Sequence, residues 1–218
     1  MDITALFKLS SGLYIIGTKD NERNIGCVVN TVVQTTAKPV TLSVCINKDN
    51  YTNTCIKKKG EFAVSILSEN IKENIIGTFG FSNSLEKDKY SGLSYGLTPS
   101  GMPYLTEGVT AFLQCKVLDT IENFTHTIFI AEVQEAENIS NEKPMTYEYY
   151  HRVIKGKAPK NASTYIDETQ ETKESDSSYK CSVCGYEFQG SKEEFEKLPN
   201  DYKCPLCGVE KSLFKKLN

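Results

Sequence analysis

Histidine is scarce in this chain. Only His126 and His151 occur among its 218 residues, so a histidine-rich metal site is excluded. No apolar run approaches the roughly 20 residues that a membrane-spanning helix needs, and the first residues lack the basic start and apolar core of a signal peptide. The formal net charge of −3 lacks the basic excess of a general nucleic-acid binder. We therefore expect a cytoplasmic protein that binds neither nucleic acid nor a membrane.

Several familiar signatures are also missing. No glycine-rich GxGxxG motif follows a predicted strand, which argues against a Rossmann dinucleotide domain. Neither HExxH nor GxSxG occurs. Any catalytic or binding role must therefore come from the cysteines and from the polar segments of the chain.

Cysteine, by contrast, is plentiful, because the chain has eight. Since nothing directs export, we expect thiols, metal ligands or redox groups rather than a disulfide framework. Four cysteines are scattered between positions 27 and 115. The other four form two tight pairs near the C-terminus: Cys181, Cys184, Cys204 and Cys207.

The first 166 residues are predicted to be mainly β. Runs rich in β-branched and aromatic residues, each typical of a strand, cover residues 12–19, 25–30, 40–47, 61–67, 111–118 and 127–133. In the run at 40–47 apolar and small polar side chains alternate, which indicates a half-buried strand. Short helices are expected at 50–59 and 70–79, and loops at 90–105. Many strands with few helices favour a barrel or a sandwich.

Residues 167–178 differ from both their neighbours. They contain no large apolar residue, and they carry five acidic side chains and one lysine. This composition is typical of a solvated, flexible linker. The chain is therefore divided into residues 1–166, this linker, and a C-terminal module of residues 179–218.

The C-terminal module contains two CxxC pairs with 19 residues between them. Two residues between thiols let both sulfurs reach one metal ion from a tight turn, and a glycine after each pair permits the backbone conformation that points amide groups at the sulfurs. Four thiolates form a closed tetrahedral site that suits Zn or Fe. Spacing alone does not choose between the two metals. A module this small can hardly build a stable core, so we expect the metal to supply much of its folding free energy.

The residues around these pairs resemble the rubredoxin family. The matching motifs are CxxCGY at 181–186 and LPxDYxCPxCGVxKxxF at 198–214. The segment between the pairs is shorter than in most free-standing rubredoxins, and Tyr202 stands where that family usually has tryptophan. The resemblance implies a one-electron Fe(Cys)4 carrier with one iron per chain. A structural Zn adaptor is the alternative, although the 7 basic and 6 acidic side chains of the module offer little for phosphates.

A second polar region lies at residues 30–54. The small polar face of the strand at 40–47 ends in Cys45 and Asn47, and the segment 48–54 is dense in hydrogen-bond donors and opens a predicted helix. A helix start with hydroxyls, amides and a lysine suits a phosphate group. A plain N-cap followed by a surface turn explains the same residues about equally well.

Five collinear segments resemble the flavin reductase-like, FMN-binding split-barrel family, in particular its flavoredoxin branch. They are the NT-containing segment at 30–35, VxLSVxINKxNYTN at 40–53, GTFGFSN and DKY at 77–90, THTIFIAEV at 125–133, and PMTYEYYHRVIKGKAPKNA at 144–162. The resemblance implies that residues 1–166 form a six-stranded antiparallel Greek-key split barrel. It further implies a homodimer with FMN at or near the subunit interface.

The same resemblance assigns candidate cofactor-binding residues. It places Asn30, Thr31 and Cys45 against the isoalloxazine ring of FMN. It places five further residues in the loop that holds the ribityl and phosphate groups: Asn47, Lys48, Tyr51, Thr52 and Asn53. Lys89, in the DKY segment, completes the set. Plain structural roles also remain open, as a small strand residue for Cys45, a solvated side chain for Lys48 and a surface residue for Lys89.

The resemblance also offers one candidate catalytic residue. His126 occupies the position where many members of the family have a histidine near the flavin and the nicotinamide. An acid often precedes that histidine, and here Thr125 replaces it. A hydrogen-bonded histidine at a strand start is the plain alternative.

Together the two modules imply a converter between two-electron and one-electron chemistry. The implied path runs from NAD(P)H to FMN, then to the Fe site, and then to a redox protein such as a flavodiiron protein that reduces O2 or NO. The linker would let the small module swing between the flavin and this acceptor. Two alternatives stay open: a pure electron carrier that a separate reductase feeds, and a non-redox Zn adaptor.

Overall fold

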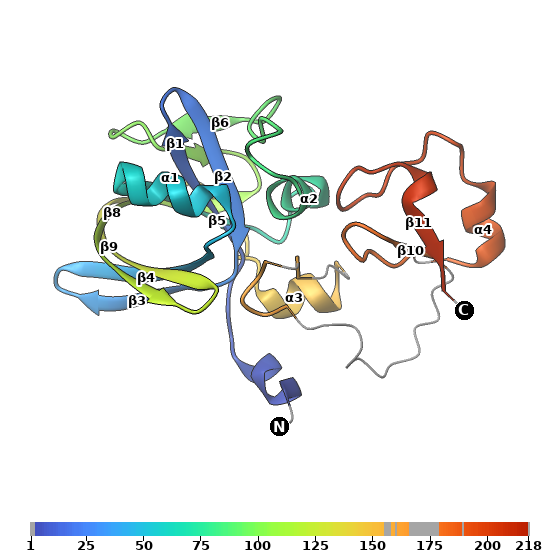
Figure 1. Ribbon diagram of the computed structural model, residues 1–218, viewed down its shortest axis with the longest axis horizontal. Helices are drawn as coiled ribbons and strands as arrows, with labels where there is room; N and C mark the ends of the chain where they lie inside the picture. The colour runs from blue at the N-terminus through green and yellow to red at the C-terminus, as the bar shows by residue number, and fades with distance from the viewer. Residues whose placement is uncertain (1–2, 155–157, 160, 166–178, 189, 218) are drawn as a thin grey trace.

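The computed structural model describes residues 3–154, 158–159, 161–165, 179–188 and 190–217. Figure 1 shows a larger β-rich lobe and a smaller C-terminal lobe beside it. The acidic linker predicted at 167–178 lies outside the described residues. Among the helices within the described ranges, none is long and apolar enough to cross a membrane.

A seven-stranded antiparallel sheet forms the larger lobe, in the order β2-β1-β5-β8-β9-β4-β3. The strands are β1 (Tyr14–Asp20), β2 (Arg23–Val29), β3 (Val32–Ala37), β4 (Val40–Asn47), β5 (Glu61–Leu67), β8 (Val109–Asn123) and β9 (His126–Asn138). The sheet curls strongly, because side chains from near both of its ends pack in one core, among them Val29 of β2 and Val44 of β4. The predicted mainly β, antiparallel split barrel is confirmed.

The strand count is seven rather than the expected six. The additional strand is β3, an edge strand with exposed side chains along almost all its length. An exposed edge strand has no alternation of buried and solvent-facing positions, so the pattern that predicts a strand is missing there. Strands β8 and β9 also run beyond their predicted ends at 118 and 133. The prediction missed these end residues because they are mostly polar and exposed, so they lack the pattern of buried positions that indicates a strand.

Helix α1 (Tyr51–Lys59) lies against the curled sheet and contacts β1, β2, β4 and β5. The side chain of Asn50 caps it by accepting a hydrogen bond from the amide of Thr52 at 3.0 Å. The helix ends at Gly60, whose φ of +73° is the left-handed conformation that favours glycine. Asn53 is buried, and its side-chain amide donates to the carbonyl of Ile46 at 3.0 Å. Asn53 thus ties α1 to the end of β4.

Four smaller features complete the larger lobe. Helix α2 (Glu73–Phe81) and the short helix α3 (Tyr147–Arg152) lie on the side that faces the C-terminal lobe (Figure 1). A 3-10 helix, η1 (Ile3–Lys8), lies near the N-terminus. Residues 90–105, expected to be loops, contain a small hairpin of β6 (Tyr95–Leu97) and β7 (Pro103–Leu105). Three-residue strands are too short to give a periodic signal.

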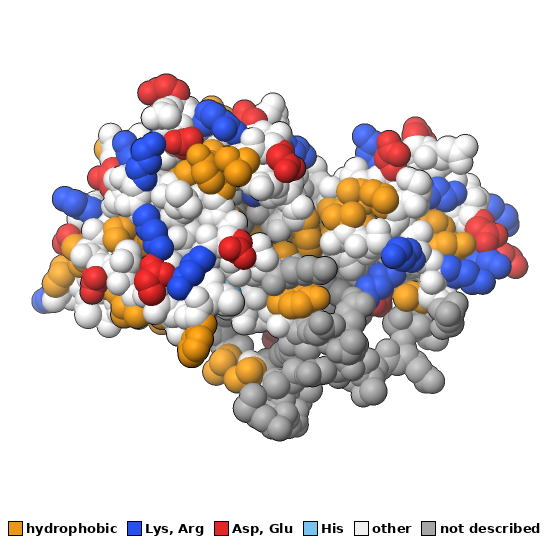
Figure 2. All heavy atoms as spheres, in the orientation of Figure 1, with side chains coloured by type: hydrophobic (Ala, Val, Ile, Leu, Met, Phe, Trp, Pro, Cys, Tyr) orange, Lys and Arg blue, Asp and Glu red, His pale blue; other side chains and the backbone are white. Residues whose placement is uncertain are grey.

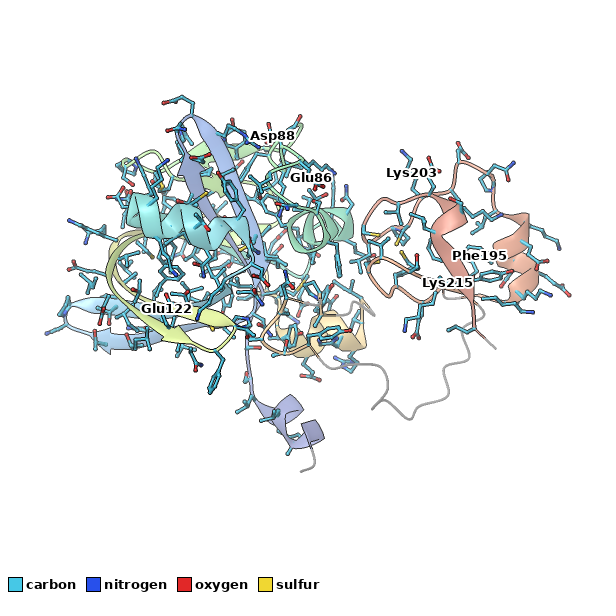
Figure 3. All side chains as sticks on the ribbon, viewed as in Figure 1. Glu86, Asp88, Glu122, Phe195, Lys203 and Lys215 are labelled. Carbon is cyan, nitrogen blue, oxygen red and sulfur yellow. The ribbon has the colours of Figure 1, made fainter. Side chains whose placement is uncertain are left out.

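The C-terminal lobe is built around aromatic side chains. Its elements are β10 (Tyr179–Cys181), α4 (Lys192–Lys197), the 3-10 helix η3 (Lys211–Leu213) and β11 (Phe214–Lys216). Phe195 of α4 points inward (Figure 3) and stacks on Tyr179 with a centroid separation of 4.0 Å. It also contacts Phe214 at 5.0 Å. The buried residues of this lobe belong to one apolar cluster that continues into α2 and α3 of the larger lobe.

We expect Asn53→Ala to destabilise the larger lobe. The change removes the buried hydrogen bond that ties α1 to the end of β4, which costs about 0.5–1.5 kcal/mol. Thr54→Ala is the matched control, because Thr54 is an exposed residue of the same helix. Chemical denaturation of both variants measures the two free energies of unfolding. Equal stabilities would show that the bond from Asn53 to Ile46 does not hold α1 in place.

Candidate functional site

The two CxxC pairs converge on one point. The sulfur atoms of Cys181, Cys184, Cys204 and Cys207 all lie within 4.8 Å of one another. The separation is 3.7 Å between the sulfurs of Cys181 and Cys207 and 3.6 Å between those of Cys184 and Cys204. A tetrahedral site with metal–sulfur bonds of about 2.3 Å has sulfur–sulfur edges of about 3.8 Å. The four sulfurs therefore fit a tetrahedral metal ion.

The backbone of the two pairs follows one pattern. The amide of Gly185 donates to the carbonyl of Cys181 at 3.0 Å, and the amide of Gly208 donates to the carbonyl of Cys204 at 2.8 Å. The two glycines have φ values of +74° and +73°. A side chain at either position would be strained in this conformation. The glycine after each pair is therefore required by the turn, as the sequence predicts.

Electrostatics make a bound cation favourable at this centre. Hydrogen bonds from the neighbouring thiols of Cys184 and Cys207 lower the pKa of Cys204 to about 2. The pKa of Cys184 is raised, because its thiol proton is held by Cys204 and Cys207. Sulfurs this close share their protons when no cation is bound, since several thiolates would repel one another. A bound metal ion would stabilise all four as thiolates.

A pocket lies where the barrel meets α2 and α3. Strands β2 and β4 and the start of β9 line it on the barrel side. Ile76, Phe81 and Tyr150 line it on the opposite side, and the segment after α3 contributes Ala158 and Pro159. One wall therefore carries polar groups, whereas the other is apolar and aromatic. This combination suits a flat cofactor with one polar edge.

Four of the residues predicted to bind or act at a flavin line this pocket: Asn30, Cys45, Asn47 and His126. The register between β4 and β9 places Asn47 directly opposite His126. Asn50, the cap of α1, joins them. Asn50 lies inside the matched segment at 40–53, so the sequence signal was present, but a capping role accounts for an asparagine at a helix start equally well.

Residues next to the pocket support it from behind. Thr31 donates through its hydroxyl to the carbonyl of Cys45 at 3.1 Å, which fixes the backbone beside the Cys45 side chain. The hydroxyl of Tyr51 donates to Asp20 at 2.8 Å and so turns away from the pocket. Thr52 is fully buried within α1. These three residues and Asn53 lie outside the lining of the pocket.

Lys48 is held in an ion pair. Its ammonium lies 2.9 Å from Glu122, and Lys57 lies 2.7 Å from the other oxygen of the same carboxylate. Glu122 lies at the end of β8 (Figure 3). Hydrogen bonds from Lys57 and then Lys48 lower the pKa of Glu122 to about 2. Lys48 would have to leave Glu122 in order to reach a phosphate group.

Lys89 is neither at the surface nor in the pocket. It is 3% exposed, and its ammonium donates to the carbonyls of Gly26 at 3.0 Å and Phe79 at 3.2 Å. Burial lowers its pKa to about 8. These two carbonyls take two of its three N–H donors, so Lys89 links α2 to β2 and lies outside the lining of the pocket. No local pattern in the sequence indicates this role, since the two carbonyls belong to distant segments.

His126 is oriented by its neighbour in sequence. Its Nδ1 atom lies 2.8 Å from the hydroxyl of Thr125, and either atom can be the donor. The threonine thus makes the contact that an acid at this position would make. The second ring nitrogen does not take part in this bond.

The free volume of the pocket is small. It is about 50 Å³, whereas cofactor pockets usually measure about 300–1,000 Å³. Residues 161–165 lie over Asn30. The side-chain amide of Asn30 donates to the hydroxyl of Thr164 at 3.0 Å, and its side-chain oxygen accepts from the hydroxyl of Ser163 at 3.5 Å. The hydroxyl groups of Thr164 and Tyr147 are also bonded, at 2.6 Å. This segment therefore occupies part of the space beside the polar side chains of the pocket.

Helices α2 and α3 separate the pocket from the metal centre. Ile76 lines the pocket, and the next residue, Gly77, packs against the backbone of Leu206 in the second CxxC pair. Tyr150 also lines the pocket, and its pKa is raised, mainly by burial and in part by Cys184 and Cys207. A helix with its side chains is about 10–12 Å thick. The two sites therefore lie on opposite sides of a single layer of helix.

Comparison with known proteins finds a family match for each of the two domains. Residues 6–157 match the flavin reductase like domain, and residues 178–214 match rubredoxin. The high molecular weight rubredoxin of Moorella thermoacetica is 40% identical over 188 residues, which cover 85% of this chain and 82% of that protein. The ferric-chelate reductase (NAD(P)H) of Archaeoglobus fulgidus is 39% identical over 167 residues, covering 77% of this chain and 99% of its own.

Solved structures agree on the fold of the larger lobe. The NADH:FAD oxidoreductase of Streptomyces globisporus superposes with a TM-score of 0.60 at 22% sequence identity, covering 65% of this chain and 84% of that one. One family match covers the barrel, and the other covers the tetrahedral cysteine site. The chain therefore belongs to the flavin reductase-like family and carries a C-terminal rubredoxin domain, which makes it an electron-transfer flavoprotein.

Proposed function

We propose that this chain passes electrons from NAD(P)H through FMN in the barrel pocket to iron in the four-cysteine site, and on to a redox protein such as a flavodiiron O2 or NO reductase. The observation that carries the proposal is that one layer of helix borders both sites. Ile76 of α2 and Tyr150 of α3 line the pocket, and the C-terminal lobe packs against the other side of these helices. Such closeness suits the transfer of electrons between the two sites.

The pocket supplies binding and orientation for the flavin, and a bound flavin supplies the change from hydride to single-electron chemistry. Asn30, Asn47 and Asn50 offer amide donors and acceptors for its polar edge. Ile76 and Phe81 cover its apolar face and exclude water. The hydroxyl of Thr125 holds the imidazole of His126 through Nδ1, and His126 lines the pocket, so its second ring nitrogen could hold a proton beside a bound flavin.

Residues around the start of α1 support the phosphate end of FMN. Lys48 is the cation nearest to Asn47 in sequence, and the amides at the start of α1 point along the helix axis. Thr31, Tyr51, Thr52 and Asn53 hold this region in shape. A bound phosphate would compete with Glu122 for Lys48.

The number of electrons that each cofactor exchanges determines how many times the Fe site must be reduced for each NAD(P)H. Oxidation of one NAD(P)H to NAD(P)+ releases two electrons and one proton as a hydride. An Fe(Cys)4 site exchanges one electron at a time. Two transfers through the C-terminal lobe, and two electrons accepted by the partner protein, therefore follow each hydride.

One observation favours the alternative of a pure electron carrier without its own NAD(P)H oxidation. Residues 161–165 lie over Asn30 and leave little free volume for a nicotinamide beside a flavin. In that case a separate reductase would supply the electrons. The two functions differ only in the source of electrons and share the transfer from flavin to iron.

Cofactor content tests the two sites separately. We expect the purified protein to hold about one Fe per chain and one non-covalent FMN, with the thiolate-to-iron absorption of a rubredoxin. Cys204→Ser should lose the iron and keep the FMN, because the pocket contains none of the four cysteines of the metal centre. Metal analysis and chromatography of the heat-released flavin measure both. Stoichiometric zinc from iron-rich cultures, or FAD as the released flavin, would contradict the assignment.

Anaerobic mixing with NADH or NADPH tests the source of electrons. Because only a flavin can take a hydride, we expect the flavin absorption to bleach before, or together with, the absorption of the Fe site. Cys204→Ser should still show flavin bleaching. If neither nicotinamide bleaches the flavin, whereas dithionite does, the chain is a carrier that depends on a separate reductase.

We also propose that the protein is a homodimer. Several large hydrophobic side chains are exposed on β3 and on the arm formed by β8 and β9: Val33 at 61%, Leu118 at 55%, Ile121 at 50% and Phe124 at 95%. Apolar side chains gathered on projecting strands are typical of an interface. A second copy of the chain is the partner that the family resemblance implies.

Sedimentation analysis tests the dimer. We expect twice the mass of one chain for the natural protein, and a larger monomer fraction for the double variant Ile121→Lys and Phe124→Lys, because paired lysines repel across a twofold interface. Leu213→Lys is the control, since Leu213 is also an exposed apolar residue (43%) and lies on the C-terminal lobe. A monomeric natural protein would overturn the proposal.

A further inference from the structure

A glycine in the middle of α2 has no role within its own helix. Gly77 lies at the fifth of nine helical positions, where glycine costs about 0.5–1 kcal/mol relative to alanine. A Cβ atom added at Gly77 would overlap the carbonyl group of Leu206 and lie 2.8 Å from the Cα atom of Cys207. The missing side chain is therefore what lets the second CxxC turn lie directly on the helix.

The surface of the rubredoxin domain that meets α2 is buried. Leu206, between the two cysteines of that turn, is 0% exposed and belongs to the apolar cluster that includes Ile75 and Ile76 of α2. The tip of the other CxxC turn differs, because Val183 remains 43% exposed. Figure 2 shows hydrophobic side chains on both sides of the boundary between the lobes. The buried contact with α2 is therefore made by the second CxxC turn, while Val183 of the first turn lines the crevice beside it.

That turn carries two of the four metal ligands. Cys204 and Cys207 flank Leu206 in sequence, and the Cys204 sulfur contributes to the raised pKa of Glu73 on α2, which burial mainly causes. A crevice between the lobes is lined by Gly77, Phe81 and Cys207. Phe81 also lines the flavin pocket. The path from the pocket to a ligand sulfur therefore crosses one helix at the point where the helix is thinnest.

We propose that the seat of the second CxxC turn on Gly77 is the position in which the Fe site takes electrons from the flavin pocket, and that Gly77 is a positioning residue for this transfer. The inference rests on the proposed function, since it assumes a flavin in the pocket and iron in the four-cysteine site. The electron passes from the reduced flavin to Fe(III), which becomes Fe(II), and no bond forms or breaks. Each seated domain takes one electron at a time.

Gly77→Leu and Gly77→Ala test the seat in the complete holoprotein. Both side chains favour a helix more than glycine does, so α2 should form in each. Light-driven chemical reduction of the flavin under anaerobic conditions starts the reaction without NAD(P)H. We expect unchanged flavin reduction and Fe reduction slowed about tenfold or more in Gly77→Leu, which corresponds to about 1.4 kcal/mol of lost docking free energy. Gly77→Ala should show a smaller effect in the same direction.

Asn74→Ala is the matched control, because Asn74 is an exposed residue of α2 and its replacement also raises helix propensity. It should leave both rates unchanged. Hydrogen exchange gives a readout without electron transfer: amides at 204–209 should exchange faster in Gly77→Leu than in Asn74→Ala. If Gly77→Leu binds its flavin and iron and still reduces Fe at the natural rate, the contact of the second CxxC turn with Gly77 is not the position in which the Fe site takes electrons.

Leu206→Gln tests the same contact from the other side and leaves α2 untouched. If Gly77→Leu does not fold, this variant decides the matter alone. We expect retained iron, retained flavin reduction and slower Fe reduction, and a natural rate would overturn the proposal. Failure of NAD(P)H oxidation in the proposed function would give a different result. A protein whose flavin is not reduced by NAD(P)H would still transfer electrons to the Fe site after light-driven reduction of the flavin. The comparison of the variants would therefore remain valid.

Discussion

Close approach across α2 is the constraint on which the rest of this structure depends. The helix has to exclude water from two sites at once, so its residues Ile75, Ile76, Gly77 and Phe79 are all buried. A helix that is apolar on nearly all sides is stable only when it is covered on nearly all sides. The barrel covers one side and the rubredoxin domain the other. Each lobe therefore contributes to the stability of the layer that divides them.

The position of α2 depends in turn on contacts from distant parts of the chain. Lys89 bonds the carbonyls of Phe79 in α2 and Gly26 in β2. Buried ammonium groups are costly unless their donors are satisfied, so this side chain fixes the distance between the helix and the barrel. Phe79 also meets Tyr90 edge to face at 5.1 Å. The pocket keeps its width because its far wall is held in this way.

Much of this arrangement could be predicted from the sequence, where local patterns carry the information. The predicted strands at 40–47 and 61–67 coincide with β4 and β5. The first shows the alternation of a half-buried strand, and the second is a short run rich in β-branched and aromatic residues that is buried along most of its length. The four-cysteine site was predicted because two short turns determine its geometry. The match to the flavin reductase-like family rests on segments of the same kind.

What could not be predicted depends on contacts between distant segments. Gly77 belongs to a matched motif, yet only the packed structure places the turn around Leu206 against it. Lys89 lies in another matched motif, and its carbonyl partners are 63 and 10 positions away. Strand β3 was not predicted, because an exposed edge has no burial pattern. The position of residues 161–165 over Asn30 was not predicted either, because no periodic signal marks an irregular segment.

The seat on Gly77 is small, and its smallness has a consequence for how the two domains evolve together. Because the rubredoxin domain is covalently joined to the barrel, its local concentration near α2 is of the order of millimolar. A contact of low intrinsic affinity is then still occupied for much of the time. Natural selection can therefore exchange one such domain for another with little change to the barrel, provided that the new turn is flat and the glycine is kept.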